Sequence, residues 1–162
     1  MIEEWFAALE ATELAAALRD SFWSYPLVNA AHILGVALLV GSIVPLDLRL
    51  LGAWRAVPLA PLWRVLTRTA GVGLVLAIIF GTLLFITRAT EYAASNLFIA
   101  KMAVVGLGMA NALALRMLPP PAQIAETTSP HGKPPPRLRL TAGLSLATWL
   151  TALTLGRLVG YF

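Results

Sequence analysis

A single histidine, His32, lies inside the long apolar run FWSYPLVNAAHILGVALLVGSIVPLDLRLLG. Tyr25 and Asn29 come seven and three residues before it, so the three side chains share one face of a helix. His32 lies about seven residues into the apolar span that begins near Tyr25, which is about 10 Å along a helix axis. An imidazole at that depth can ligate a metal ion or a haem iron, or form a hydrogen bond with a buried ligand.

Other apolar runs carry side chains that we expect to lie near the same end of the molecule. Lys101 and Met102 follow the start of the third run, and Arg157 precedes the end of the fourth. Lysine and arginine bind haem propionates, and a histidine with a lysine can hydrogen-bond to quinone carbonyl groups. The sequence therefore predicts one cofactor site, with His32 as the ligand where a metal is bound. Its predicted members are Tyr25, Asn29, His32, Lys101, Met102 and Arg157.

Three cofactors use these residue types, and they differ in the ligands they need. Haem b needs a second axial ligand, which would be His32 of a second chain, a residue of a partner subunit, or Met102. A quinone needs only hydrogen-bonding groups. Copper(I) prefers thiolate, thioether or imidazole ligands, but the methionines of the third run are too widely spaced to form one site. Haem b and quinone therefore rank ahead of copper.

The same residues also have a purely structural interpretation, which the sequence leaves open. A neutral imidazole can hydrogen-bond to a neighbouring helix and so hold two helices together. Lys101 and Arg157 are close enough to the ends of their runs for their charged groups to reach water. On this interpretation the protein needs no cofactor.

The composition excludes several classes of site. The chain has no cysteine, which removes disulfides, thiolate metal sites, iron–sulfur clusters and cysteine nucleophiles. The sequence contains no hydrolase triad, P-loop or pair of neighbouring carboxylates. The net charge of +4 does not indicate nucleic-acid binding, because the basic residues flank apolar runs and form no basic face. We therefore expect no hydrolytic enzyme, and an electron-transfer subunit if the protein is redox-active.

The elements that must position these residues follow from hydropathy. Apolar residues make up 59% of the chain and charged residues only 12%, against roughly 25% charged residues in soluble domains. Backbone groups in lipid must be hydrogen-bonded internally, so long apolar runs are predicted to be helices. We predict an all-α integral membrane four-helix bundle preceded by an amphipathic surface helix. Four runs approach the roughly 20 residues that a bilayer requires, at about 25–46, 69–88, 97–117 and 139–161.

Small residues within these runs indicate where helices can approach closely. Gly106 with Ala110, and Gly156 with Gly160, have the four-residue spacing that brings small side chains onto one helix face. This spacing is common in alanine-rich spans, so it is a weak signal.

Two segments lie outside the predicted spans. Residues 1–20 alternate apolar and acidic positions at helical spacing, which predicts an amphipathic helix on the membrane surface, followed by the bundle at 21–162. The segment 118–136, LPPPAQIAETTSPHGKPPP, is proline-rich, and we expect an extended loop. His131 lies in that loop and receives no ligand role.

Lysine and arginine are distributed unequally between the two predicted sides. The connections after the first and third spans carry eight of them, namely Arg49, Arg55, Arg64, Arg68, Arg116, Lys133, Arg137 and Arg139. The other side carries Arg19, Arg88, Lys101 and Arg157. The positive-inside rule therefore places both connections in the cytoplasm and both termini outside.

The first apolar run resembles the first span of an uncharacterised family of small bacterial four-helix membrane proteins. In that family tryptophan, tyrosine–proline, histidine, glycines and aspartate–leucine–arginine follow in this order, as do Trp23, Tyr25, Pro26, His32, Gly35, Gly41, Asp47 and Arg49 here. The family's third span is similar to NLFIAKMAVVGLGMANALALR through Lys101 and Asn111. Shortly after that asparagine the family is expected to have a histidine or another basic residue. This chain has Arg116 there, and the resemblance gives Arg116 no ligand role. The layout is more distantly similar to the copper-resistance D membrane domain and to small cytochrome b membrane subunits. The resemblance implies a bacterial inner membrane protein but no particular activity.

Three functions remain open on these observations. The first is a redox- or metal-linked membrane subunit with a haem b, quinone or copper site around His32. The second is a non-catalytic scaffold that anchors a partner, and the third is a small-solute transporter that acts as an oligomer. Each predicts the lipid bilayer as a partner, together with a second copy or another membrane subunit, and none predicts nucleic acid.

Overall fold

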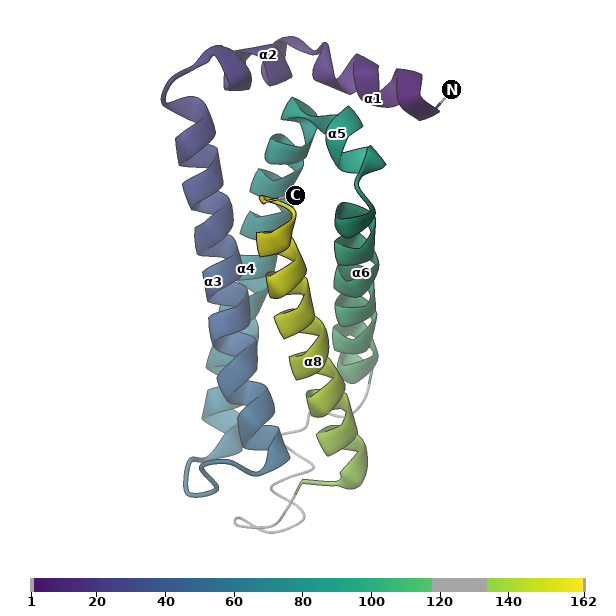
Figure 1. Ribbon diagram of the computed structural model, residues 1–162. Coiled ribbons are helices and arrows are strands. Elements are labelled where there is room, and N and C mark those ends of the chain that lie inside the picture. The colour runs from purple at the N-terminus through teal and green to yellow at the C-terminus, as the bar shows by residue number, and fades with distance from the viewer. Residues whose placement is uncertain (1, 118–133, 162) are drawn as a thin grey trace.

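The computed structural model describes residues 2–117 and 134–161, and every regular element within them is a helix (Figure 1). The all-α prediction is therefore confirmed. Most of the predicted loop at 118–136, with His131, lies outside the described residues. The helices are α1 (Ile2–Glu10), α2 (Glu13–Asp20), α3 (Ser24–Leu51), α4 (Leu59–Thr87), α5 (Ala89–Ala94), α6 (Asn96–Arg116) and α8 (Pro136–Leu158).

Four of these helices, α3, α4, α6 and α8, are long and apolar enough to cross a membrane. This property is typical of a helical membrane protein, and the four helices correspond to the four predicted spans. Helix α3 is longer than predicted, because it continues past the predicted end at 46 to Leu51. Helix α4 begins ten residues before the predicted span, so Arg64 and Arg68 lie on its first turns and not in a loop.

The long helices form two antiparallel pairs that meet along one contact (Figure 1). Helix α3 packs along α4, and α6 packs along α8. The two pairs are joined where α3 meets α8. Within the described ranges α4 and α6 do not pack along each other, and the short helix α5 joins them.

Helices α1, α2 and α5 lie across one end of the bundle, which we name the capped end (Figure 1). The turn between α3 and α4 lies at the opposite end. The predicted amphipathic helix at 1–20 is divided into α1 and α2, because Thr12 begins a new helix. Its Oγ1 accepts a hydrogen bond from the Ala15 amide at 3.3 Å and donates one to the Leu9 carbonyl at 2.7 Å.

The closest approach of two helices is the crossing of α3 and α4 at Gly35 and Gly73. A Cβ atom at Gly73 would lie 2.5 Å from the Leu39 nitrogen and 2.7 Å from the Gly35 carbonyl oxygen. A Cβ atom at Gly35 would lie 2.6 Å from the nitrogen of Ala77. The two backbones are therefore in direct contact, which only glycine permits at these positions.

The pair α6–α8 is held by a different set of contacts. The Trp149 ring lies against Gly108, where a Cβ atom would be 3.1 Å from the ring. The side-chain amide of Asn111 donates a hydrogen bond to the Thr141 carbonyl at 3.2 Å. By contrast, Gly106 has nothing within 4 Å of a Cβ position, so its predicted close contact is not made among the described residues.

A buried apolar cluster and an arginine organise the end opposite the cap. Leu46, Leu50, Leu59 and Ala142 pack together and join α3, α4 and α8. Arg49 is buried, and its guanidinium donates hydrogen bonds to the carbonyls of the loop that connects α3 to α4, at 2.9 Å and 3.3 Å. The arginine thereby fastens the loop to α3.

The crossing predicts different outcomes for two glycines on α4. Gly73→Ala should lower the free energy of unfolding by about 1–3 kcal/mol, because the added methyl group forces the backbones apart. Gly71→Ala is the matched control, since nothing lies within 4 Å of its Cβ position, and alanine is the better helix former. Denaturant titration in mixed micelles measures both values. Equal stability of the two variants would show that α3 and α4 do not approach as closely as described.

Candidate functional site

His32 is anchored to α4 by one of its two ring nitrogens. Its Nδ1 lies 2.9 Å from the carbonyl oxygen of Ala77. A carbonyl oxygen can only accept a hydrogen bond, so Nδ1 carries the proton and donates it. In the neutral imidazole this leaves Nε2 with a free lone pair. The same arrangement orients many metal-ligating and proton-accepting histidines.

The ring of His32 lies against Gly81, one helical turn beyond Ala77. A Cβ atom at Gly81 would lie 2.9 Å from Cε1 and 3.1 Å from Nδ1 of the imidazole, and 3.9 Å from Nε2. The ring therefore presents its Nδ1–Cε1 edge to α4, and any larger residue at position 81 would displace it. Gly81 was not among the predicted site residues, although Gly73, Ala77 and Gly81 repeat at four-residue spacing on α4.

Lys101 is the cation that the structure brings near His32. It is close enough for its charge to act on the imidazole. Its aliphatic stem lies against Gly156 of α8, with Cε 3.6 Å from the position of a Cβ atom there. Its Nζ lies 5.6 Å from the centre of the Phe98 ring. Within residues 2–117 and 134–161 we find no ion pair or hydrogen bond for this ammonium group.

An aromatic cluster of Phe6, Phe85, Tyr92 and Phe98 lies on the capped-end side of Lys101. The ring centres of neighbours are 5.3–6.2 Å apart, and α1, α4, α5 and α6 each contribute one ring. Phe85 lies one turn beyond Gly81 on α4, and Phe98 lies one turn before Lys101 on α6. The aromatic cluster thus separates the His32–Lys101 region from the helices that cover the capped end.

Tyr25 lies next to this cluster. It is close to the phenol of Tyr92, whose pKa is raised. Burial of Tyr92 is the largest cause, and the neighbouring Tyr25 and Glu91 act in the same direction. The positive charge of Arg88 opposes them.

The remaining predicted site residues lie on the exposed surface of the single chain. Asn29 is exposed, and the Met102 side chain is 49% exposed. Arg157 is exposed as well, and its guanidinium stacks over the ring of Tyr161 and donates a hydrogen bond to its hydroxyl. The structure therefore brings His32 and Lys101 together and leaves the ligand roles of Asn29, Met102 and Arg157 as predictions.

The donor set can be compared with the needs of each cofactor. In the described part of the chain no three histidine or acidic side chains gather as they would around a metal ion. For copper or haem the region offers one imidazole, so a second ligand has to come from elsewhere. A quinol or quinone needs only hydrogen-bond acceptors and donors, the group types that Nε2 of His32 and the Lys101 ammonium represent.

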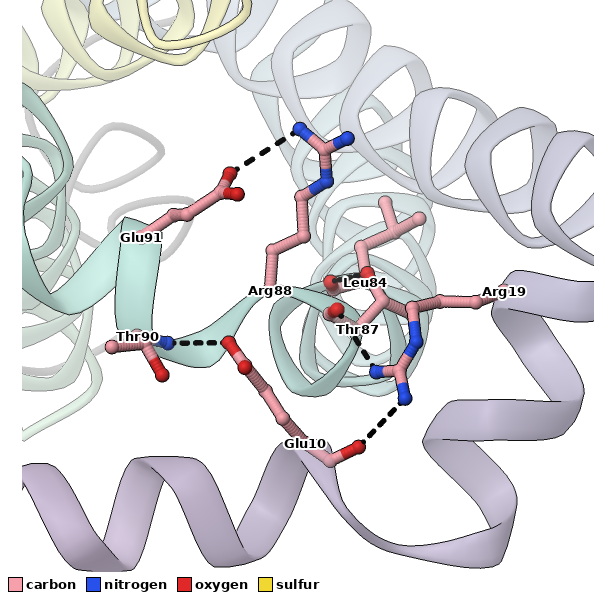
Figure 2. A network of polar contacts seen from close by, with 7 residues as sticks. All are labelled: Glu10, Arg19, Leu84, Thr87, Arg88, Thr90 and Glu91. Carbon is pink, nitrogen blue, oxygen red and sulfur yellow. Dashed lines mark hydrogen bonds and ion pairs between the residues drawn. The ribbon is translucent and has the colours of Figure 1, made fainter.

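A second group of polar residues lies at the capped end, around a depression of about 480 Å³. Figure 2 shows that Arg19 donates hydrogen bonds to the carbonyls of Thr87 and Glu10, at 3.2 Å and 2.9 Å. The Glu10 carboxylate accepts one from the Thr90 amide at 2.7 Å, and Arg88 pairs with Glu91 at 3.2 Å. These bonds fasten α1 and α2 to the turn between α4 and α5, so we assign this network a structural role.

Comparisons of the chain with profiles of protein families, with curated proteins and with solved structures find no match. The resemblance to small bacterial four-helix membrane proteins therefore stays a prediction. The function has to be argued from the geometry of the chain itself.

The burial of Tyr92 predicts how this phenol titrates. Because its folded-state pKa is raised, the stability contributed by the neutral phenol is present below about pH 10 and is lost as pH rises further. Alkaline titration of tyrosinate absorbance should show a late component that disappears in Tyr92→Phe. Tyr161→Phe, just after the C-terminal end of α8, is the control and should leave that component in place. A late component that survives Tyr92→Phe would contradict the assignment.

Proposed function

We propose that the protein is a membrane subunit that binds a quinol or quinone in the half of the bundle nearer the capped end. The proposal rests on which ring nitrogen of His32 is hydrogen-bonded within the protein. Its Nδ1–H is held by the Ala77 carbonyl, which leaves Nε2 as an acceptor, and the charge of the Lys101 ammonium acts on the imidazole. A polar acceptor and a charged donor near aromatic rings, such as Phe98 close to the Lys101 ammonium, suit a small-molecule site.

The two groups complement both redox forms of such a ligand. Nε2 of His32 accepts a hydrogen bond from a quinol hydroxyl, and the ammonium of Lys101 donates one to a quinone carbonyl. A charged donor strengthens that bond relative to a neutral one. Phe85 and Phe98 supply aromatic surface against which a quinone ring can stack.

Haem b and copper use the same histidine in a different assembly. Nε2 of His32 would supply one ligand, and a second copy or a partner subunit would supply the other. Lys101 would then pair with a haem propionate. We rank these below a quinol because a quinol is satisfied by the groups that one chain provides.

The second candidate function is a non-catalytic scaffold, and one observation favours it. The bond from His32 to Ala77 joins α3 to α4, so it stabilises the helix pair whether or not a ligand is present. On this view Lys101 extends toward water, and its stem packs on Gly156 for structural reasons only.

Ligand content after purification separates these functions. The protein is purified in mild detergent, and bound lipids are extracted and assayed for quinones by chromatography. We expect His32→Asn to lower quinone content about tenfold or more, because the asparagine amide keeps the bond to Ala77 but lacks Nε2. Lys101→Met should lower it by a similar factor, since the stem is preserved and the charge is lost.

Asn111→Leu is the matched control for this experiment. Like His32, Asn111 makes one bond from its side chain to a carbonyl of a neighbouring helix. A scaffold predicts that all three variants behave alike and that none changes ligand content. A Soret band in the wild-type visible spectrum, shifted by dithionite and lost in His32→Asn, would replace the quinol with haem b.

We further propose that the protein lies in a bacterial inner membrane with the capped end outside. The described arginines of the predicted cytoplasmic side, Arg49, Arg55, Arg64, Arg68, Arg137 and Arg139, belong to the end opposite the cap or to the adjoining helix turns. The positive-inside rule places that end in the cytoplasm.

Single cysteines test this orientation, because the natural chain has none. Ala11→Cys lies between α1 and α2, and Ala56→Cys lies between α3 and α4; both positions are exposed. In intact cells a membrane-impermeant maleimide should label the first variant and not the second, and disruption of the cells should make the second reactive. Labelling of Ala56→Cys alone would reverse the orientation.

A further inference from the structure

Asp47 is a buried carboxyl group with an oxygen that has no partner. It lies on α3 near the end opposite the cap and is only 5% exposed. Its carboxyl group lies close enough to the Ser145 hydroxyl of α8 for the hydroxyl to act on it as a hydrogen-bond donor. Its Oδ2 is fully buried and has no hydrogen-bond partner in the described part of the chain.

The neighbours of Asp47 are mostly apolar. Leu46 and Leu50 on α3 belong to the apolar cluster that Ala142 of α8 completes. Thr148, one turn beyond Ser145 on α8, is buried, and its hydroxyl donates to carbonyls of its own helix. Water and protein groups therefore do little to stabilise a negative charge at Oδ2.

None of the cations on the adjacent elements balances this charge. Arg49, on the same helix, donates to loop carbonyls instead. The arginines on the nearby parts of α4 and α8 are all exposed, namely Arg64, Arg68, Arg137 and Arg139. No ion pair with Asp47 is found across residues 2–117 and 134–161. A buried carboxylate without a counter-charge costs several kcal/mol, so it requires a cation of its own.

We propose that Asp47 and Ser145 form a binding site for one monovalent cation, either a proton or Na⁺, at the contact between α3 and α8. A single carboxylate neutralises one positive charge, which excludes a divalent ion as the natural occupant. Carboxylate and hydroxyl oxygens are ligands that hard cations prefer, and a proton on Oδ2 satisfies the same charge balance.

This cation site is separate from the proposed quinol site. Asp47 follows His32 by fifteen residues on the same helix, which corresponds to about 22 Å. Its neighbours come from α3 and α8, whereas His32 is bound to α4. The two proposals can therefore fail independently.

The test measures thermal stability of the detergent-purified protein against two variables. Na⁺ is varied at pH 8 with ionic strength held constant by choline chloride, and pH is varied from 8 to 5 in choline chloride alone. A sodium site predicts a Tm that rises with the logarithm of Na⁺ concentration. A proton site predicts no response to Na⁺ and a Tm that rises as pH falls, because the folded state then binds the extra proton.

Asp47→Asn has the same shape without the charge, so it should abolish whichever response the wild type shows. Asp20→Asn removes an exposed carboxylate at the capped end, and as the control it should leave the response intact. Ser145→Ala keeps the carboxylate but removes its hydroxyl partner. It should shift the midpoint of the Na⁺ response about tenfold upward, or move the pH response by about one unit.

Two results would overturn the proposal. The first is a wild-type response to Na⁺ and pH that Asp47→Asn shares, or no response in either protein. The second is an Asp47→Asn variant that is less stable than wild type under every condition, because that would show that Asp47 pairs with another protein group.

Discussion

The contact between the backbones of α3 and α4 at Gly35 and Gly73 is the constraint on which the rest of the structure depends. It fixes the distance and register of the two helices at one point. Three residues before Gly35, His32 consequently meets the carbonyl of Ala77, four residues after Gly73. The imidazole can lie there only because Gly81 has no side chain. A single steric fact therefore decides which ring nitrogen is bonded and which remains available for a ligand.

Helix α3 carries a basic residue, His32, toward one end and an acidic residue, Asp47, toward the other. Near the capped end, His32 reaches α4 and keeps a free acceptor, and Lys101 approaches from α6. Near the other end, Asp47 reaches α8 through Ser145 and keeps an oxygen without a partner. His32 and Asp47 are each held by one hydrogen bond, and each keeps a polar atom without a partner in the described part of the chain. A polar atom without a partner costs free energy in low-dielectric surroundings. Such atoms are therefore more informative about function than the hydrogen bonds already formed.

Hydropathy and helical spacing were sufficient to predict the all-α fold and the positions of four long apolar helices. They underestimated the lengths of α3 and α4. At the end opposite the cap, helix turns that contain charged residues and proline lower the local hydropathy although the helices continue. The break at Thr12 depends on a cap that apolar spacing does not reveal. For the site, residue type identified His32 and Lys101, but the rotation of each helix decides which side chains converge, and Asn29 and Met102 lie on exposed faces. Small-residue spacing identified Gly106, whereas the same rule applied to α4 would have identified Gly73, Ala77 and Gly81.

A ligand of His32 and Lys101 would have to enter the protein either through the capped end or from the hydrocarbon phase of the bilayer. The capped end is covered by α1, α2 and α5 (Figure 1), and the rings of Phe85 and Phe98 join α4 to α6. Exchange through the hydrocarbon phase would leave the three covering helices in place. Occupancy would follow the mole fraction of ligand dissolved in the bilayer and not its vanishingly small concentration in water. Dilution with additional lipid would empty such a site even when the total amount of ligand stays constant.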